Sequence, residues 1–147
     1  MPTPQAVIDT NVFISACLGV GAANRVIAAA LLQQFTPVMG IALFSEYEAV
    51  LSRQHLFTHS RLSESERNEL LDAFLARCTW TRIYYQWRPN LKDEADNHLI
   101  ELAVAAGAQR IVTSNLRDFA NASLRMDGLM THFNIVSPHD FLQELAP

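Results

Sequence analysis

Short apolar runs alternate along this chain with longer segments in which apolar residues recur at helical spacing. The short runs are bounded by turn residues and predict strands over 6–9, 37–39, 79–85, 110–113 and 134–136. The longer segments predict helices over 24–35, 41–52, 94–106 and 138–145, and from Ser63 as far as Cys78. Because strands separated by helices favour a parallel sheet, we predict an α/β fold.

Residues with known capping preferences mark where several of these helices begin and end. Ser63 followed by Glu66 is a capping-box pattern, and Gly107 is placed to stop the helix before it. Ser137 and Pro138 suit the N-cap and the first position of the last helix. No low-complexity linker or internal repeat separates these elements, so residues 1–147 are predicted to form a single domain.

The balance of acidic and basic residues gives little information about the partner of this chain. Fifteen acidic residues stand against eleven basic ones, which gives a formal net charge of −4. This balance is not the electropositive one that is typical of nucleic-acid binders. If four of the acids bind cations, however, the other eleven balance the eleven bases. Net charge therefore leaves the class of partner open.

Two further features indicate the compartment. No apolar run approaches the roughly 18 residues needed to span a bilayer, and the first residues lack the basic start of a signal peptide. Cys17 and Cys78 lie far apart within apolar patterns, without the spacing of a zinc site, and are expected to be reduced core thiols. We therefore expect a cytoplasmic protein that does not associate with a membrane.

Asp9 is the first candidate for chemistry, because it stands between apolar residues directly after the first predicted strand. A buried carboxylate without a partner costs several kcal/mol, so its charge must be compensated. One interpretation is a cap or turn where a strand passes into a helix. The other is a metal ligand. Parallel sheets bind ligands beyond the carboxyl ends of their strands, which is where Asp9 and the turn over 113–118 fall.

Asp96 is the second candidate. A helix turns by about 100° per residue, which places Asp96 on the same apolar face as Leu99 and Ile100. Glu101 points to the opposite side and is expected to be an ordinary surface residue. Because Asp96 lies in a first helical turn, where the helix dipole favours an anion, a structural role with Asp93 as the cap is the alternative.

Two more acids complete the set. Glu46 lies beside Val50 at the edge of an apolar stripe, which suits either a side chain that reaches into a cleft or a half-solvated one. Asp118 follows a core strand among turn residues, where a cap or turn role is the alternative. Together with Asp9 and Asp96 they predict a catalytic cluster of hard oxygen ligands for Mg²⁺ or Mn²⁺. Such a cation can activate water against a phosphodiester bond.

With these residues in view, the chain resembles the PIN-domain nucleases, especially the toxins of VapBC-like toxin-antitoxin pairs. The family's opening motif is similar to Asp9-Thr10-Asn11, and its early helical Glu to Glu46. Its acidic turn is similar to 93–97, where Asp96 takes the metal-binding place, and its last strand and acidic turn to 111–119. The resemblance covers nearly the whole chain. We assign the polar residues of these motifs, Thr10, Asn11, Thr113 and Ser114, to binding or orienting the substrate.

The resemblance implies a three-layer α/β/α fold with a central parallel sheet and endoribonuclease activity that depends on Mg²⁺ or Mn²⁺. It also implies an RNA substrate, a homodimer and a small inhibiting antitoxin. The chain departs from the family at Asn115, where many members carry an Asp. An amide can donate an oxygen to a metal but brings no charge, so we predict that a second cation binds only weakly.

Other protein classes fit the sequence less well. A haloacid-dehalogenase-like phosphatase needs a second Asp where Asn11 stands, and a receiver domain needs a phosphoacceptor Asp with a matching Lys that this chain lacks. The remaining alternative is a PIN-fold module that binds RNA or protein with little or no catalysis, for which Asn115 is the best support. The five histidines show no ligand spacing and are expected to be surface or half-buried residues.

Overall fold

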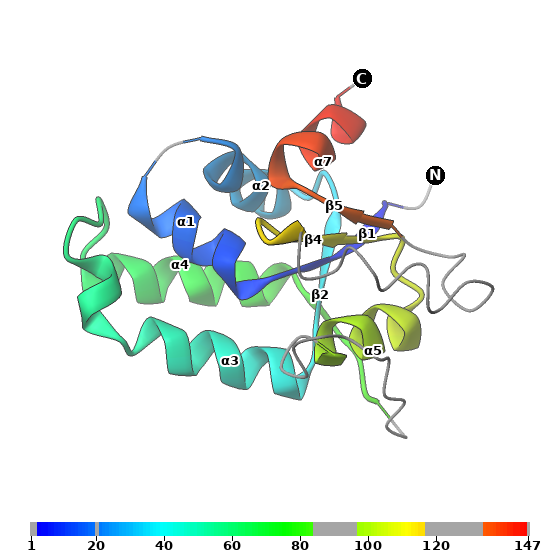
Figure 1. Ribbon diagram of the computed structural model, residues 1–147, viewed down its shortest axis with the longest axis horizontal. Helices are drawn as coiled ribbons and strands as arrows, with labels where there is room; N and C mark the ends of the chain where they lie inside the picture. The colour runs from blue at the N-terminus through cyan, green and yellow to red at the C-terminus, as the bar shows by residue number, and fades with distance from the viewer. Residues whose placement is uncertain (1–2, 20, 84–96, 117–133, 147) are drawn as a thin grey trace.

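The computed structural model describes residues 3–19, 21–83, 97–116 and 134–146 (Figure 1). The strands of this part are β1 (Gln5–Ile8), β2 (Thr36–Met39), β3 (Thr79–Trp80), β4 (Arg110–Val112) and β5 (Asn134–Val136). The helices are α1 (Thr10–Leu18), α2 (Ala22–Leu31), α3 (Ile41–Leu51), the 3₁₀ helix η1 (Gln54–Phe57), α4 (Glu64–Arg77), α5 (Asn97–Ala106) and α7 (Pro138–Leu145).

The five strands form one parallel sheet in the order β3-β2-β1-β4-β5, which confirms the predicted α/β class. β1 lies at the centre of the sheet, where Val7 pairs with Val38 of β2 on one side and with Ile111 of β4 on the other. Ile8 pairs with Val112, so β1 and β4 end level with each other. The residues that follow these two strands are therefore neighbours at the carboxyl edge of the sheet.

Helices cover the sheet on both sides and give the three-layer α/β/α arrangement. Figure 1 shows α2 and α7 on one side of the strands and α5 on the other. α5 packs against β1, β2, β4 and α3, and its residues 99–103 are all buried. Glu101 is one of these and is only 7% exposed, so the prediction that it lies at the surface was wrong. The helical-face argument failed because α5 is covered on more than one side.

The predicted helix boundaries hold where capping chemistry marks them. Ser63 and Glu66 form the full capping box of α4, and the Ser137 hydroxyl caps α7 with Pro138 at its start. Gly107 follows α5 with a φ of 68°, a conformation in which glycine has no Cβ penalty. α2 ends at Leu31 rather than at residue 35, because Gln33 adopts a positive φ of 62° that interrupts the helix.

Two segments differ further from the predictions. α1, which begins directly after Asp9, was not predicted as a helix. Its residues 10–18 are apolar on most sides and include several β-branched side chains, so they carry no helical polar face. The strand predicted over 79–85 ends at Trp80 within the described part, and residues 84 and 85 lie outside it.

The two cysteines are free thiols, as expected, with Cys17 buried and Cys78 half-buried. Burial raises the pKa of Cys17 to about 11 and that of Cys78 to about 12, so both are protonated at neutral pH. Within the described ranges no single helix is long and apolar enough to cross a membrane. α1 and α2 together have the length and composition, but they bend by 104° at their junction and contribute buried residues to the core.

Candidate functional site

Asp9 is a buried carboxylate at the carboxyl end of β1. Its residue is 5% exposed, and its Oδ2 accepts hydrogen bonds from the Thr113 hydroxyl at 2.8 Å and from Asn11 Nδ2 at 3.1 Å. Asp9 occupies the N-cap position of α1, yet its side chain makes no cap hydrogen bond. A capping role therefore does not account for this side chain.

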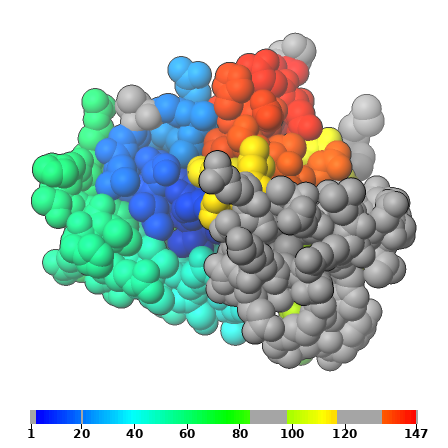
Figure 2. Space-filling model, in the orientation of Figure 1, coloured from blue at the N-terminus to red at the C-terminus, as the bar shows by residue number. Residues whose placement is uncertain are grey.

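The loop after β4 and the first turn of α1 are joined around Asp9. Thr113 is fully buried, and its hydroxyl also accepts a hydrogen bond from the backbone N–H of Asn115 at 3.0 Å. The Oδ1 of Asn11 accepts one from the N–H of Ser114 at 3.1 Å. Figure 2 shows the start of α1, in dark blue, against the β4 region, in yellow. These residues, predicted to orient the substrate, here hold the carboxylate of Asp9.

Tyr47 places α3 against the same end of β1. Its hydroxyl is buried and donates a hydrogen bond of 2.7 Å to the backbone carbonyl of Ile8. Asp9 follows Ile8 in the chain and Glu46 precedes Tyr47, so this bond brings the two predicted metal ligands into one neighbourhood. Their mutual electrostatic influence agrees with this, because the charge of Glu46 raises the pKa of Asp9.

His98, at the start of α5, is the residue that the sequence analysis missed. Its Nε2 lies 2.7 Å from the Oε2 of Glu46, and the two side chains are 17% and 33% exposed, respectively. The expectation that the histidines are surface or half-buried residues holds for its exposure. Its position in the first turn of α5, two residues after Asp96 and on a helix that packs against α3, is the signal that could have identified it.

The pKa values of Asp9 and Glu46 are shifted in opposite directions. Desolvation by burial raises the pKa of Asp9, and the hydrogen bond from Thr113 opposes this effect only partly. The hydrogen bond with His98 lowers the pKa of Glu46, while partial burial of Glu46 works against that effect. Among the described residues, Asp9 is thus the member of the pair whose negative charge is compensated less completely.

A divalent cation fits the chemistry of these groups. The hydrogen bonds that Asn11 and Thr113 donate both reach Oδ2 of Asp9, and the backbone N–H of Thr10 also stabilises this carboxylate. The hydroxyl of Thr10, a residue only 2% exposed, lies close enough to Glu46 to help lower the pKa of that carboxylate. Hard oxygen donors of this kind suit Mg²⁺ or Mn²⁺. The described residues alone contain no group of three His, Cys, Asp or Glu side chains placed to hold a metal.

Two of the four predicted acids cannot be placed. Asp96 and Asp118 lie outside the described residues, so the structure brings together Asp9 and Glu46 only. Asn115, the predicted neutral ligand, is exposed in the loop after β4, and its backbone belongs to the network around Thr113. The convergence of the full set stays a prediction.

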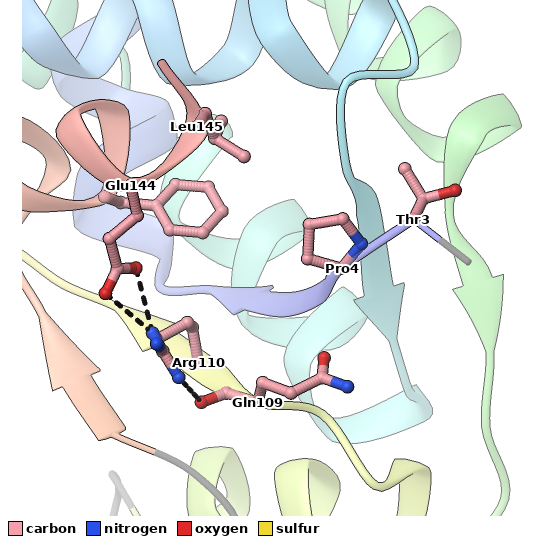
Figure 3. A pocket seen from close by; sticks show the side chains of 7 residues that line it. Thr3, Pro4, Gln109, Arg110, Glu144 and Leu145 are labelled. Carbon is pink, nitrogen blue, oxygen red and sulfur yellow. Dashed lines mark hydrogen bonds and ion pairs between the residues drawn. The ribbon is translucent and has the colours of Figure 1, made fainter. Parts of the chain in front are cut away.

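A cavity lies at the opposite, amino end of the sheet (Figure 3). This cavity of about 370 Å³ is lined by Thr3, Pro4, Gln109, Arg110, Phe141, Glu144 and Leu145. Arg110 Nε donates to both carboxylate oxygens of Glu144 at 3.0 and 2.9 Å, and Arg110 also donates to the carbonyl of Gln109. Its charged groups thus satisfy each other, so we do not assign it a ligand.

The chain belongs to the PIN domain family, whose sequence pattern it matches over residues 5–117. Proteins of this family are generally nucleases. A solved chain with a similar fold occurs in the crystal structure of VapBC2 from Rickettsia felis bound to a DNA fragment from their promoter. The two chains are 13% identical with a TM-score of 0.57, over 90% of this chain and 98% of that one. No curated protein matches this sequence.

Proposed function

We propose that this protein is a metal-dependent endoribonuclease, the toxin of a toxin-antitoxin pair. The observation that carries the proposal is the state of Asp9, a buried carboxylate at the carboxyl edge of a parallel sheet. Neutral donors hold it, and within the described residues no basic side chain forms an ion pair with it. Keeping such a charge uncompensated is costly, and perturbed carboxylates of this kind gather at functional sites.

Asp9 and Glu46 would hold the cation, with Asp96 and Asp118 as further proposed ligands and Asn115 as a neutral one. A bound Mg²⁺ or Mn²⁺ would supply the positive charge that activates water and neutralises charge developing on the phosphodiester. The chain's own contribution is orientation. Thr113 and Asn11 fix Oδ2 of Asp9, so that the direction of its other oxygen is set before a ligand arrives.

The proposed partners follow from the same assignment. The fold neighbour is part of VapBC2, which supports a small antitoxin as the partner of this chain. We further propose a homodimer that acts in the cytoplasm on RNA. Release of the chain from its antitoxin would expose the carboxyl edge of the sheet to the substrate.

Cleavage of an end-labelled single-stranded RNA by the purified protein tests the activity. We expect cleavage in Mn²⁺ and none in EDTA, and Asp9→Asn should lower the rate at least about a hundredfold, which is about 2.7 kcal/mol of transition-state stabilisation. Glu46→Gln should also lose activity, whereas Glu48→Gln, an exposed acid on the same helix, is the matched control. Full cleavage in EDTA, or an unimpaired Asp9→Asn protein, would exclude the mechanism.

A PIN-fold module that binds RNA or protein without cleavage is the second candidate. It is favoured by Asn115, which places a neutral amide where the family often carries a carboxylate. RNA that binds in a gel-shift assay but stays intact in Mn²⁺ would support this candidate over the nuclease.

A further inference from the structure

The contact between His98 and Glu46 links two helices that cover different parts of the sheet. Glu46 lies on α3, which follows β2, and His98 lies on α5, which precedes β4. Their side chains meet with the Nε2 of His98 2.7 Å from the Oε2 of Glu46. A separation this short is typical of a charge-assisted hydrogen bond. The residues are 52 positions apart, so only the folded chain forms this pair.

The surroundings of the imidazole indicate which nitrogen carries the proton. His98 Nδ1 is buried and has no hydrogen-bond partner within the described part of the chain. A buried N–H without an acceptor costs about 1–3 kcal/mol, so a proton on Nδ1 is disfavoured. The proton therefore belongs on Nε2, where the ring donates it to Oε2 of Glu46. His98 thus holds Oε2 of Glu46, and Oε1 is the oxygen that would face a cation, on a carboxylate with which the Thr10 hydroxyl also interacts.

We infer that His98 is a positioning residue, which fixes the carboxylate of Glu46 so that its second oxygen can bind the same divalent cation as Asp9. This inference rests on the proposed function and adds a residue to it. Carboxylates that bind metals are commonly held by such outer hydrogen bonds, and loss of an outer partner weakens metal binding. Without the donor, Glu46 is a half-exposed side chain with several accessible rotamers.

Calorimetric titration with MnCl₂, in the absence of RNA, tests the inference on the full chain. His98→Leu removes the donor at similar bulk and should weaken Mn²⁺ binding about 10–100-fold. His98→Gln can place an amide N–H near the position of Nε2 and should restore most of the affinity. Glu48→Gln is the control that should leave the affinity unchanged. Thermal melting in EDTA checks that each variant folds. If His98→Leu does not fold, His98→Asn replaces it, because the Asn side chain is too short to reach Glu46.

A double-mutant cycle shows whether His98 acts through Glu46. Once Glu46→Gln is in place, adding His98→Leu should change the Mn²⁺ affinity little, because the carboxylate to be positioned is gone. Folded His98→Leu protein that binds Mn²⁺ like the unaltered chain would overturn the inference alone, as would folded His98→Gln protein as weak as His98→Leu. No Mn²⁺ binding by the unaltered protein would overturn both the inference and the proposed function.

Discussion

The charged side chains at the two ends of the central sheet are stabilised in different ways. At the amino end, Arg110 and Glu144 form an ion pair in which Nε of Arg110 donates to both carboxylate oxygens. Both side chains remain partly exposed, at 27% and 40%. At the carboxyl end, Asp9 is 5% exposed and is held by neutral donors, Asn11 and Thr113. A charge pair that water also solvates needs nothing further, whereas a desolvated carboxylate held by neutral groups does.

This difference separates an arrangement of charge that is complete in itself from one that a ligand would complete. The cavity at the amino end is a measurable hollow, but its two charged side chains, Arg110 and Glu144, already pair with each other. At the carboxyl end, within the described residues, a buried carboxylate with a raised pKa is held only by neutral donors. Uncompensated groups, rather than the size of a hollow, therefore identify where a ligand would bind.

The largest expected effect concerns stabilisation by metal. Mn²⁺ at a hundred times its dissociation constant should stabilise the unaltered protein by about 2.7 kcal/mol. Asp9→Asn should lose this effect. In EDTA, however, the variant should be at least as stable as the unaltered chain, because a neutral amide replaces the desolvated charge. Urea unfolding with and without Mn²⁺ measures both. Equal stabilisation of the two proteins by Mn²⁺ would contradict the comparison of the two ends.

The second prediction concerns the bond that sets α3 against β1. Tyr47→Phe leaves the buried carbonyl of Ile8 without its donor and should lower the free energy of unfolding by about 1–3 kcal/mol. The same variant should weaken Mn²⁺ binding, since it loosens the helix that carries Glu46. Urea unfolding and calorimetry give the two values. A destabilised variant with unchanged Mn²⁺ affinity would mean that Tyr47 supports the core without placing Glu46.

The third prediction sharpens the assignment of Asn115. Asn115→Asp adds a negative charge at nearly constant size in the loop that follows β4, and should tighten Mn²⁺ binding up to about tenfold, or 1.4 kcal/mol, without changing the fold. Titration by calorimetry decides this. No gain in affinity, or two tight sites in the unaltered protein, would place Asn115 outside the metal shell.

The smallest effect is expected at the amino end. Glu144→Gln breaks a partly exposed ion pair and should change the free energy of unfolding by about 0–1 kcal/mol. It should leave Mn²⁺ affinity untouched, which makes it the matched control for Asp9→Asn at the other end of the sheet. A loss of Mn²⁺ binding in this variant would show that the two ends are coupled.

The sequence predicted the sheet and the position of Asp9 because both depend on local signals. Short β-type runs such as 110–112 predict strands from their own residues. An acid that directly follows the buried strand residues 6–8 can likewise be recognised without reference to the rest of the chain. Capping residues such as Ser63 also act within a few positions of their targets. These features could be found without knowing how the helices pack.

The rest depends on packing between distant elements. Glu101 is buried because α5 packs against α3 as well as against the strands of the sheet. The hydrogen bond between His98 and Glu46 likewise joins helices that are far apart in the chain. α1 escaped prediction for a related reason, since its apolar residues are buried against α2 and α3 and leave no polar face. Tertiary contacts of this kind leave no periodic trace in a sequence.

The hydrogen bond between Thr113 and Asp9 has a consequence for the synthesis of the chain. Its two residues are 104 positions apart, so a ribosome that adds about 5–20 residues per second needs roughly 5–20 s to make the second after the first. During that interval Asp9 lacks the hydroxyl that orients it. Under the proposed function, the nascent chain would therefore stay inactive until the strand before Thr113 has joined the sheet.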